Sequence, residues 1–214
     1  MRLWLPYKAE LCDLAAKHQT DKGPFQINAS VSPKAYTKHY ADWFRSVKNE
    51  PFNFLEIGVK GGASLRMWKE YFPNAQIYGI DIKPKCKQHE EDRIEIFTGD
   101  QKDKGFLEEV ARQIGVLHIV LDDGLHTSAS HIPSFEALFP YVISGGLYII
   151  EDLFATLGLP CFTDELSEGR STLDYFNVEV DVLMKNKPQD LGLIGSIGFY
   201  RPKTHGALMC VQKR

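Results

Sequence analysis

The sequence predicts an α/β fold: a Rossmann-like, seven-stranded, mostly parallel sheet with helices on both faces and a C-terminal antiparallel hairpin. Three observations predict it. Short apolar strands alternate with amphipathic helices from residue 52 to residue 150. A glycine-rich turn joins the first of these strands to its helix. Two strands separated only by a short polar turn end the chain, which is typical of an antiparallel sheet edge.

Residues 1–50 precede the alternating region and are expected to form a helical extension that covers the substrate and the cofactor. Within it, Tyr7 to His18 has the spacing of a short amphipathic helix. Thr20 to Pro33 is rich in turn-forming residues and is expected to be a loop. Ala35 to Val47 carries aromatic residues at helical spacing, which favours packing against the main domain of residues 51–214.

The main domain begins with the alternating strands and helices. The expected parallel strands are Phe54–Gly58, Gln76–Asp81, Ile94–Phe97, Leu117–Leu121 and Leu147–Ile150. The expected helices between them are Gly62–Tyr71, Phe106–Ile114 and Pro133–Val142. Strands that alternate with helices in this way form parallel sheets whose ligands bind at the carboxyl ends of the strands.

The last quarter of the chain has a different pattern. A helix is expected at Thr172–Met184, followed by strands at Leu193–Tyr200 and Ala207–Gln212 around the turn Arg201–Gly206. The stretch Leu153–Arg170 is long and irregular. Loops of this length in compact domains are usually functional and often act as lids.

Composition narrows the class of protein. The chain has 214 residues and a net charge of −3, which gives no sign of a nucleic-acid or acidic-membrane surface. No apolar run approaches the roughly 20 residues needed to cross a bilayer, and the N-terminus is too short and too quickly polar for a signal peptide. The four cysteines are scattered, which favours reduced thiols in a cytoplasmic protein.

The glycine-rich turn predicts a nucleoside site. Gly58, Gly61 and Gly62 follow the first strand, but Lys60 occupies the position where a dinucleotide fingerprint needs its second glycine. That substitution speaks against NAD or FAD. Asp81 ends the next strand, where an acid can hydrogen-bond ribose hydroxyls. A nucleoside without a pyrophosphate, such as S-adenosylmethionine, fits this combination; the alternative is a mere strand–helix turn.

A group of acids follows two neighbouring strands. Asp122, Asp123 and His126 come after one apolar run, and Glu151 and Asp152 come after the next. Parallel neighbours would bring these side chains together at one edge of the sheet, where unpaired carboxylates are costly. Carboxylates without a nearby cysteine prefer a hard cation such as Mg²⁺. The alternatives are a solvated strand end and, for the histidine, a helix cap.

The chain resembles the class I S-adenosylmethionine-dependent methyltransferases. The motifs that carry the resemblance are Leu55–Gly58, Tyr78–Asp81, Thr98–Asp100 and Leu121–Asp123. It implies that Glu56, Gly58 and Gly61 lie near the methionine part of the cofactor and that Asp81 holds the ribose. It also implies adenine contacts from Asp100 and Gln101, a further cofactor contact from Ser64, and a place for Asp122 on the cofactor side.

A narrower resemblance points to the macrocin and mycinamicin sugar O-methyltransferases. It covers roughly residues 18 to 155 and rests on the stretches Thr20–Gly23, Ser64–Pro73, Asp122–His126, Ser134–Pro140 and Gly145–Asp152. The resemblance implies that Asp123, Glu151 and Asp152 bind Mg²⁺ and that His126 is the general base. A metal ion can orient a vicinal diol and lower the pKa of its hydroxyl, and a histidine can take the proton.

These inferences predict a Mg²⁺-dependent O-methyltransferase that uses S-adenosylmethionine. The expected acceptor is a small molecule with vicinal hydroxyls, with a sugar on a natural product as first choice. A catechol-type O-methyltransferase, a non-catalytic nucleoside-binding module and an NAD-dependent oxidoreductase are the alternatives. No nucleic-acid or membrane partner is expected, and a homo-oligomer is left open. We expect His131 at the surface, and His118 and Tyr148 in structural roles.

Overall fold

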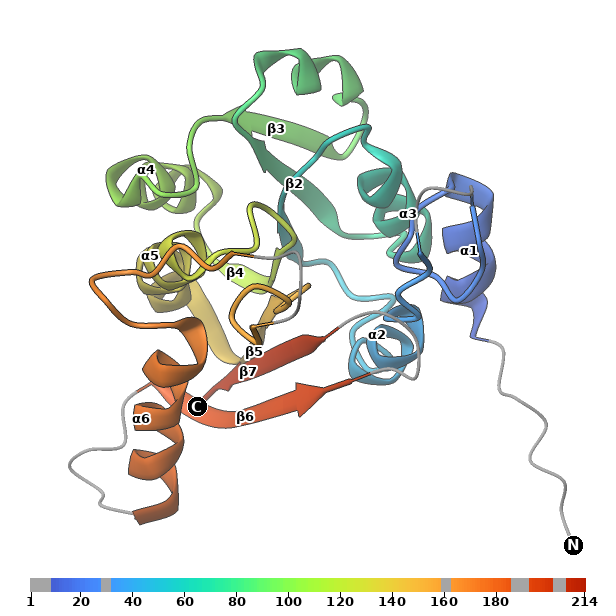
Figure 1. Ribbon diagram of the computed structural model, residues 1–214. Helices are drawn as coiled ribbons and strands as arrows, with labels where there is room; N and C mark the ends of the chain where they lie inside the picture. Colours follow the sequence, from blue (N-terminus) through green and yellow to red (C-terminus); the bar gives the residue numbers. More distant parts are fainter. Residues whose placement is uncertain (1–8, 28–31, 159–162, 186–192, 202–206) are drawn as a thin grey trace, which may run out of the picture.

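The predicted fold class is confirmed by a computed structural model, which describes residues 9–27, 32–158, 163–185, 193–201 and 207–214. A seven-stranded sheet in the order β3-β2-β1-β4-β5-β7-β6 runs through the molecule, with helices on both faces (Figure 1). The first five strands pair in parallel. The last two are antiparallel, because β7 lies between β5 and β6 and pairs antiparallel with both.

The strands agree with the predicted segments to within a few residues, except at β5. Their bounds are β1 Asn53–Ile57, β2 Gln76–Asp81, β3 Ile94–Thr98, β4 Leu117–Asp122, β5 Val142–Ile150, β6 Ile194–Tyr200 and β7 Leu208–Lys213. The order reverses between β1 and β4, since β2 and β3 extend the sheet on one side and β4 and β5 on the other. Ligands of open α/β sheets bind at such a switch point.

Six α-helices and two short 3-10 helices are present in the described residues. They are α1 Glu10–His18, α2 Thr37–Trp43, α3 Ala63–Tyr71, η1 Pro84–His89, α4 Lys104–Ile114, α5 Ser128–Leu138, η2 Phe139–Tyr141 and α6 Thr172–Lys185. Helices α1, α2 and α3 pack on one face of the sheet, and α4, α5 and α6 pack on the other (Figure 1). The N-terminal extension therefore belongs to the same compact body as the sheet.

Alternation along the strands assigns each side chain to one of two cores. In β1, Phe54 faces α3 while Leu55 faces the layer of α4 and α5. The first core is aromatic: Trp68 of α3 lies 5.1 Å from Phe54 and 5.9 Å from Phe44, measured between ring centroids. The prediction that the aromatic residues of α2 pack against the main domain is thus confirmed.

The boundaries of α5 and β5 differ from the prediction. The helix begins at Ser128 rather than Pro133, because Thr127 and Ser130 form a capping box that starts it five residues earlier. Proline is favoured in a first helical turn, which made Pro133 a natural start, but here it lies inside the helix. Strand β5 begins at Val142 rather than Leu147, and its irregular first half contains Gly145 at φ 79°.

Three further predictions concern the periphery. The first helix starts at Glu10, and the hairpin is antiparallel as expected, but the turn residues 202–206 and the start of the predicted helix at Tyr7 lie outside the described residues. Cys12, Cys86 and Cys210 are free and buried. None of the helices in the described ranges is both long and apolar enough to cross a membrane.

Candidate functional site

The glycine turn after β1 brings two parts of the site into backbone contact. Gly58 has a φ of 96°, in the left-handed region that favours glycine. A Cβ atom at this position would clash with the backbone carbonyl of Asp123, at the end of β4. Gly62, also left-handed at φ 68°, opens α3. The turn between β1 and α3 therefore lies directly against the start of the acidic segment.

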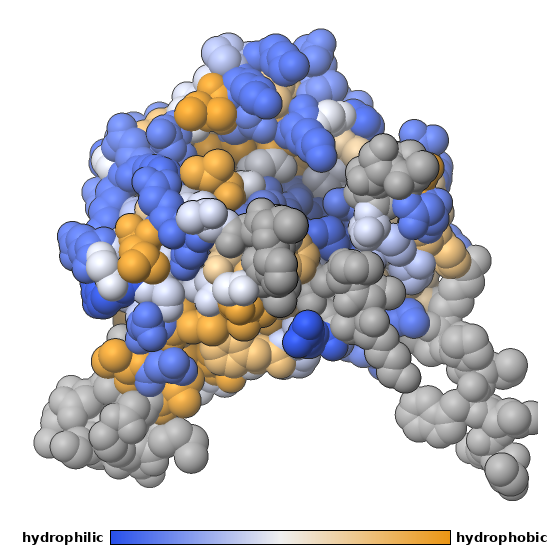
Figure 2. Space-filling view, viewed as in Figure 1, coloured by the Kyte–Doolittle hydropathy of each residue, from blue (hydrophilic) through white to orange (hydrophobic). Residues whose placement is uncertain are grey.

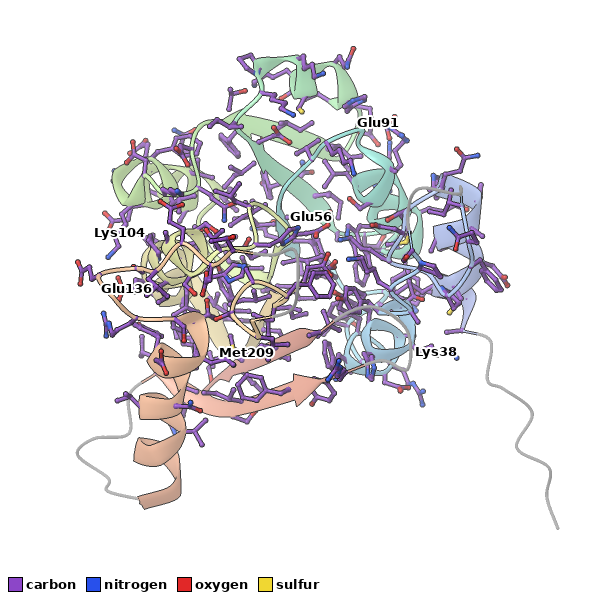
Figure 3. The ribbon with its side chains drawn as sticks, viewed as in Figure 1. Lys38, Glu56, Glu91, Lys104, Glu136 and Met209 are labelled. Atoms are coloured by element: carbon purple, nitrogen blue, oxygen red, sulfur yellow. The ribbon has the colours of Figure 1, made fainter. Side chains whose placement is uncertain are left out.

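A cleft of about 780 Å³ opens at the carboxyl ends of the parallel strands. Figure 2 shows a hollow with hydrophilic residues around it in the middle of this face. The predicted site residues that line the cleft are Gly58, Gly61, Ser64, Asp81, Asp100, Gln101, Asp123, His126 and Asp152. The other three predicted residues are buried behind the wall of the cleft: Glu56, Asp122 and Glu151. Figure 3 shows Glu56 near the centre of the molecule.

Asp81 holds the glycine turn through backbone hydrogen bonds. Its Oδ2 accepts the N–H groups of Val59 at 3.1 Å and Lys60 at 2.9 Å, and its Oδ1 accepts the N–H of Lys83 at 2.9 Å. Partial burial opposes ionisation of Asp81, but these hydrogen bonds outweigh it and lower the pKa of the carboxyl. The acid at the end of β2 is therefore ionised and directed into the turn that lines the cleft.

Gln101 and Asp122 form a second hydrogen-bonded unit beside the cleft. The Nε2 atom of Gln101 donates to Asp122 at 3.2 Å, and its Oε1 accepts the N–H of Leu125 at 2.7 Å. Burial raises the pKa of Asp122 to about 6, against the opposing effects of His126 and of its hydrogen bonds. Asp122 therefore holds the side chain of Gln101 by a hydrogen bond and does not line the cleft itself.

The acids after β4 and β5 come together as the sequence predicts. Strands β4 and β5 pair in parallel, with Asp122 opposite Ile150, so Asp123 and Asp152 follow on adjacent strands. One ligand atom each of Asp123, His126 and Asp152 lies within 4.8 Å of the other two. His126 and Asp152 both have left-handed backbones, with φ of 61° and 56°. Non-glycine residues in this region carry strain and cluster at functional sites.

The sequence pattern predicts no role for Lys22, yet its ammonium group lies in the middle of these acids. Its side chain is 1% exposed. The Nζ atom lies 2.5 Å from Oδ2 of Asp123, 2.8 Å from Oε1 of Glu151 and 3.2 Å from Oε1 of Glu56. The Glu56 contact is an ion pair without hydrogen-bond geometry, and Trp68 donates to the other oxygen of Glu56 at 3.0 Å.

Three more residues of the N-terminal part contact the acids. The hydroxyl of Tyr40 donates to Oε1 of Glu151 at 2.6 Å, and the hydroxyl of Tyr36 donates to Oδ1 of Asp152 at 2.5 Å. Lys34 forms an ion pair with the other oxygen of Asp152. The aromatic spacing of α2 indicated core packing, which is correct for the rings but does not show where the hydroxyl groups point.

Burial and neighbouring charges shift the pKa values of the groups in this cluster. Burial alone would lower the pKa of Lys22, but the surrounding carboxylates outweigh it and raise that pKa, so the lysine stays charged. Burial and the charge of Asp123 raise the pKa of Glu151. Burial also raises the pKa of Glu56 to about 7, against the lowering effect of Lys22. Burial therefore opposes the ionisation of both glutamates, and the charge of Lys22 favours it.

Two histidines approach this side of the cleft in different ways. The Nε2 atom of His126 lies 3.7 Å from Oδ1 of Asp123, and its side chain is 32% exposed. His131 was predicted at the surface, and this is wrong: it is fully buried, and its Nδ1 contacts the hydroxyl of Thr172 at 3.1 Å. The packing of α6 on α5 covers it. His118 is structural as expected, since its Nδ1 accepts the N–H of Asn53.

The donor set suits a hard divalent cation. Asp123 and Asp152 each present a carboxylate oxygen, and the two atoms lie within 4.8 Å of each other, while the buried Glu151 shares Lys22 with Asp123. Lys22 and Tyr40 both contact Oε1 of Glu151. The imidazole of His126 is a poor ligand for Mg²⁺, and its Nε2 atom lies 3.7 Å from Oδ1 of Asp123.

Comparison with known proteins identifies relatives that are named O-methyltransferases. No protein-family model matches the chain. The chain is 44% identical over 154 residues to mycinamicin VI 2''-O-methyltransferase of Micromonospora griseorubida, which covers 69% of this chain and 37% of that protein. It is 43% identical over 168 residues to demethylmacrocin O-methyltransferase of Streptomyces fradiae; this match covers 73% of this chain and 42% of that protein. The chain thus spans less than half the length of these relatives.

A solved structure extends the similarity to nearly the whole chain. The MycE methyltransferase of the mycinamycin pathway, in complex with Mg, SAH and mycinamycin VI, superposes with a TM-score of 0.78 at 35% identity. The match covers 97% of this chain and 55% of MycE. The resemblance to the mycinamicin and macrocin sugar O-methyltransferases that the sequence motifs predict is therefore confirmed, both in sequence and in fold.

Proposed function

We propose that the chain is the catalytic part of a Mg²⁺-dependent O-methyltransferase that transfers a methyl group from S-adenosylmethionine to a sugar hydroxyl of a natural product. The observation that carries the proposal is the single cleft shared by the glycine turn and the acids. Gly58, Ser64 and Asp81 line it on one side, and Asp123, His126 and Asp152 line it on the other. A methyl donor and a metal-bound acceptor would meet there.

Each side of the cleft has a separate task. Asp81 would hold the ribose, with Asp100 and Gln101 beside the adenine, while the turn around Gly58 and Gly61 would receive the methionine part. Glu56 lies near the end of β1, just before this turn, and accepts a hydrogen bond from Trp68. Asp123, Glu151 and Asp152 would hold Mg²⁺, which when bound orients two neighbouring hydroxyls and lowers the pKa of one.

His126 would take the proton of the acceptor hydroxyl. Its Nε2 atom faces Asp123, whose charge would stabilise the imidazolium form. Methyl transfer from a sulfonium is an in-line displacement, so the protein's main contribution is to align the two reactants. Relatives that act on sugars of macrolides and of tetracenomycin support a glycosylated acceptor. A cytoplasmic location and the oligomeric state stay predictions.

The decisive experiment is a methyl-transfer screen with labelled S-adenosylmethionine, with Mg²⁺ and after its removal by EDTA. Glycosylated natural products with vicinal hydroxyls form one set of acceptors, and catechols form the other. We expect transfer to sugar hydroxyls only, loss of turnover with EDTA, and recovery when Mg²⁺ is restored. Transfer to catechols alone, or full turnover after EDTA, would contradict the proposal.

Calorimetry on the same protein tests the cofactor separately. We expect S-adenosylmethionine to bind whether or not Mg²⁺ is present, because the glycine turn and Asp81 contact the cofactor side without using the acids. We expect no binding of NAD, since Lys60 lies where a pyrophosphate would need a glycine. Binding of NAD in place of S-adenosylmethionine would contradict the proposed function at its first step.

A further inference from the structure

We propose that Lys22 is a positioning residue of the metal site: its ammonium group fixes Glu151 and one oxygen of Asp123 so that the cluster can accept a divalent cation. The inference rests on the proposed function, because it assumes that the acids bind a metal ion. It assigns a role to the segment between α1 and α2, where the sequence indicates only a turn-rich loop. The role of Lys22 is to hold ligands, not to contact the reacting atoms.

The burial of Lys22 is the first argument. A lysine that is 1% exposed has lost its hydration, which is costly unless specific partners replace the water. Here three carboxylates replace it, and two of them accept hydrogen bonds from Nζ at 2.5 and 2.8 Å. Those two partners, Asp123 and Glu151, come from the ends of adjacent strands. The lysine therefore fixes the distance between two of the proposed metal ligands.

The geometry of Asp123 is the second argument. Lys22 contacts Oδ2, whereas His126 approaches Oδ1 of the same carboxylate. The lysine thus occupies one oxygen and turns the other toward the point that His126 and Asp152 share. A carboxylate whose second oxygen is held by a hydrogen bond is oriented before a metal ion binds, and such outer partners commonly tune metal affinity.

The backbone around Lys22 makes the position rigid. The N–H of Thr37 bonds the carbonyl of Lys22 at 3.1 Å, and the N–H groups of Lys34 and Ala35 bond the carbonyls of Asp21 and Gly23 at 2.9 and 3.0 Å. These bonds tie the segment to the residues that carry Tyr36 and α2. A substitution at Lys22 therefore changes the ammonium group while its backbone stays anchored on both sides.

Charge balance is the third argument. Four carboxylates lie in the cluster: Glu56, Asp123, Glu151 and Asp152. Among the described residues, the two ammonium groups of Lys22 and Lys34 lie with them, so the formal charge of this set is −2 when all four carboxylates are ionised, as binding of a cation requires. Without Lys22 the formal charge would be −3 in a buried site, and mutual repulsion would oppose the close approach of the carboxylates.

The test compares metal binding by Lys22→Met with that by the wild-type protein. Binding of Mn²⁺, as a paramagnetic substitute for Mg²⁺, is measured by electron paramagnetic resonance without cofactor or acceptor. Methionine keeps much of the side-chain volume and removes the charge. We expect the dissociation constant for Mn²⁺ to rise roughly 10- to 100-fold, while calorimetry shows little change in affinity for S-adenosylmethionine.

Lys17→Met is the matched control. Lys17 pairs with Glu70 at 2.6 Å, but at the surface, where its side chain is 61% exposed. This variant also removes one lysine charge from the N-terminal part, so it should bind Mn²⁺ like the wild type. A comparable loss of Mn²⁺ affinity in both variants would show that general charge, and not the position of Lys22, is responsible, and would overturn the proposal.

The remaining outcomes are also decisive. Unchanged or tighter Mn²⁺ binding by Lys22→Met would overturn the proposal, because the lysine would then only compete with the cation. If that variant does not fold, Lys22→Arg keeps the charge but alters its geometry, and it must bind Mn²⁺ several-fold more weakly than the wild type; equal binding overturns the proposal. Wild-type protein that fails to bind Mn²⁺ also overturns it. Wild-type protein that binds both Mn²⁺ and S-adenosylmethionine but methylates nothing defeats only the proposed function.

Discussion

The two sides of the cleft are built in different ways. On the proposed cofactor side (Gly58, Ser64 and Asp81), Asp81 accepts backbone N–H groups from a turn 21 and 22 positions earlier in the chain. On the proposed metal side (Asp123, Glu151 and Asp152), Lys22 reaches Asp123 and Glu151 across 101 and 129 positions. The first arrangement needs only two neighbouring strands and the turn between them. The second forms only when the N-terminal part has packed against the finished sheet.

The two sides also differ in solvent exposure. Asp81 is partly exposed, so water can replace a lost hydrogen bond at modest cost. Glu151 is 2% exposed and Tyr40 is fully buried, so a lost partner there leaves a charged or polar atom with nothing in its place. The comparison therefore predicts that substitutions on the metal side reduce both stability and activity, whereas those on the cofactor side weaken binding alone.

The largest effect is expected from His126→Ala. Loss of the proposed general base should lower the methyl-transfer rate roughly 10²- to 10⁴-fold, while the affinity for S-adenosylmethionine stays the same because the cofactor side is untouched. Single-turnover kinetics over a range of pH would measure the first effect, and calorimetry the second. A rate close to that of the wild type at every pH would show that another group takes the proton.

The second-largest effect is expected in the pH dependence of the unfolding free energy, and it comes from His131. Burial, and to a smaller degree the nearby His126, lowers the pKa of His131 to about 3, whereas an unfolded histidine has a pKa of about 6.5. Below pH 6.5 the unfolded chain binds a proton that the folded chain does not. The contribution of His131 to stability is therefore complete above that pH and is lost as pH falls toward 3, by about 1.4 kcal/mol per pH unit.

His131→Gln should flatten this dependence. Glutamine can still contact Thr172 but does not titrate, so denaturant unfolding at pH 6.5, 5.5 and 4.5 should show a shallower loss of stability than in the wild type. Carboxylates contribute equally to the pH dependence of stability in both proteins, so the difference between the two pH dependences comes from His131. Parallel curves for the two proteins would mean that His131 is protonated in the folded state.

A smaller effect is expected from Tyr40→Phe. The hydroxyl donates to Glu151 at 2.6 Å within the buried cluster, and its removal should cost about 1–3 kcal/mol of unfolding free energy, measured with urea. Tyr78→Phe is the control, because Tyr78 is a partly exposed tyrosine of β2 that does not line the cleft. Equal losses from both variants would show that the buried hydrogen bond of Tyr40 to Glu151 adds no stability of its own.

The smallest of the four effects is expected from Asp81→Asn. The asparagine is uncharged and should hold the ribose less tightly, which we expect to weaken S-adenosylmethionine binding roughly tenfold, or about 1.4 kcal/mol. Mn²⁺ affinity should not change. A loss of Mn²⁺ binding in this variant would show that the glycine turn and the acids act as one site rather than as two.

The sequence predicted the fold because the alternation of strands and helices is local information. The glycine turn, Asp81 and the acids after β4 and β5 were found in the same way, since parallel strands place their carboxyl ends at one edge. Lys22, Lys34 and Tyr40 were not found. Their roles depend on how residues 20–44 fold back over the sheet, and neither spacing nor composition indicates where a lysine in a turn-rich loop will point.

The burial of His131 also depends on tertiary packing and could not be predicted from the sequence. A histidine in a polar helix start is usually exposed, and only the packing of α6 and Thr172 buries it. The functional assignments of the individual site residues remain predictions. The structure adds that Glu56, Asp122 and Glu151 are buried and are not among the residues that line the cleft.

The absence of a side chain at Gly58 has a mechanical consequence. Because the turn after β1 lies in backbone contact with the carbonyl of Asp123, nothing flexible separates the loop that would receive the donor from the loop that would carry the acceptor's metal ion. A shift of a few tenths of an ångström in one loop must displace the other. The glycine thereby sets the spacing between the two loops, and with it the distance between a bound methyl donor and a bound acceptor.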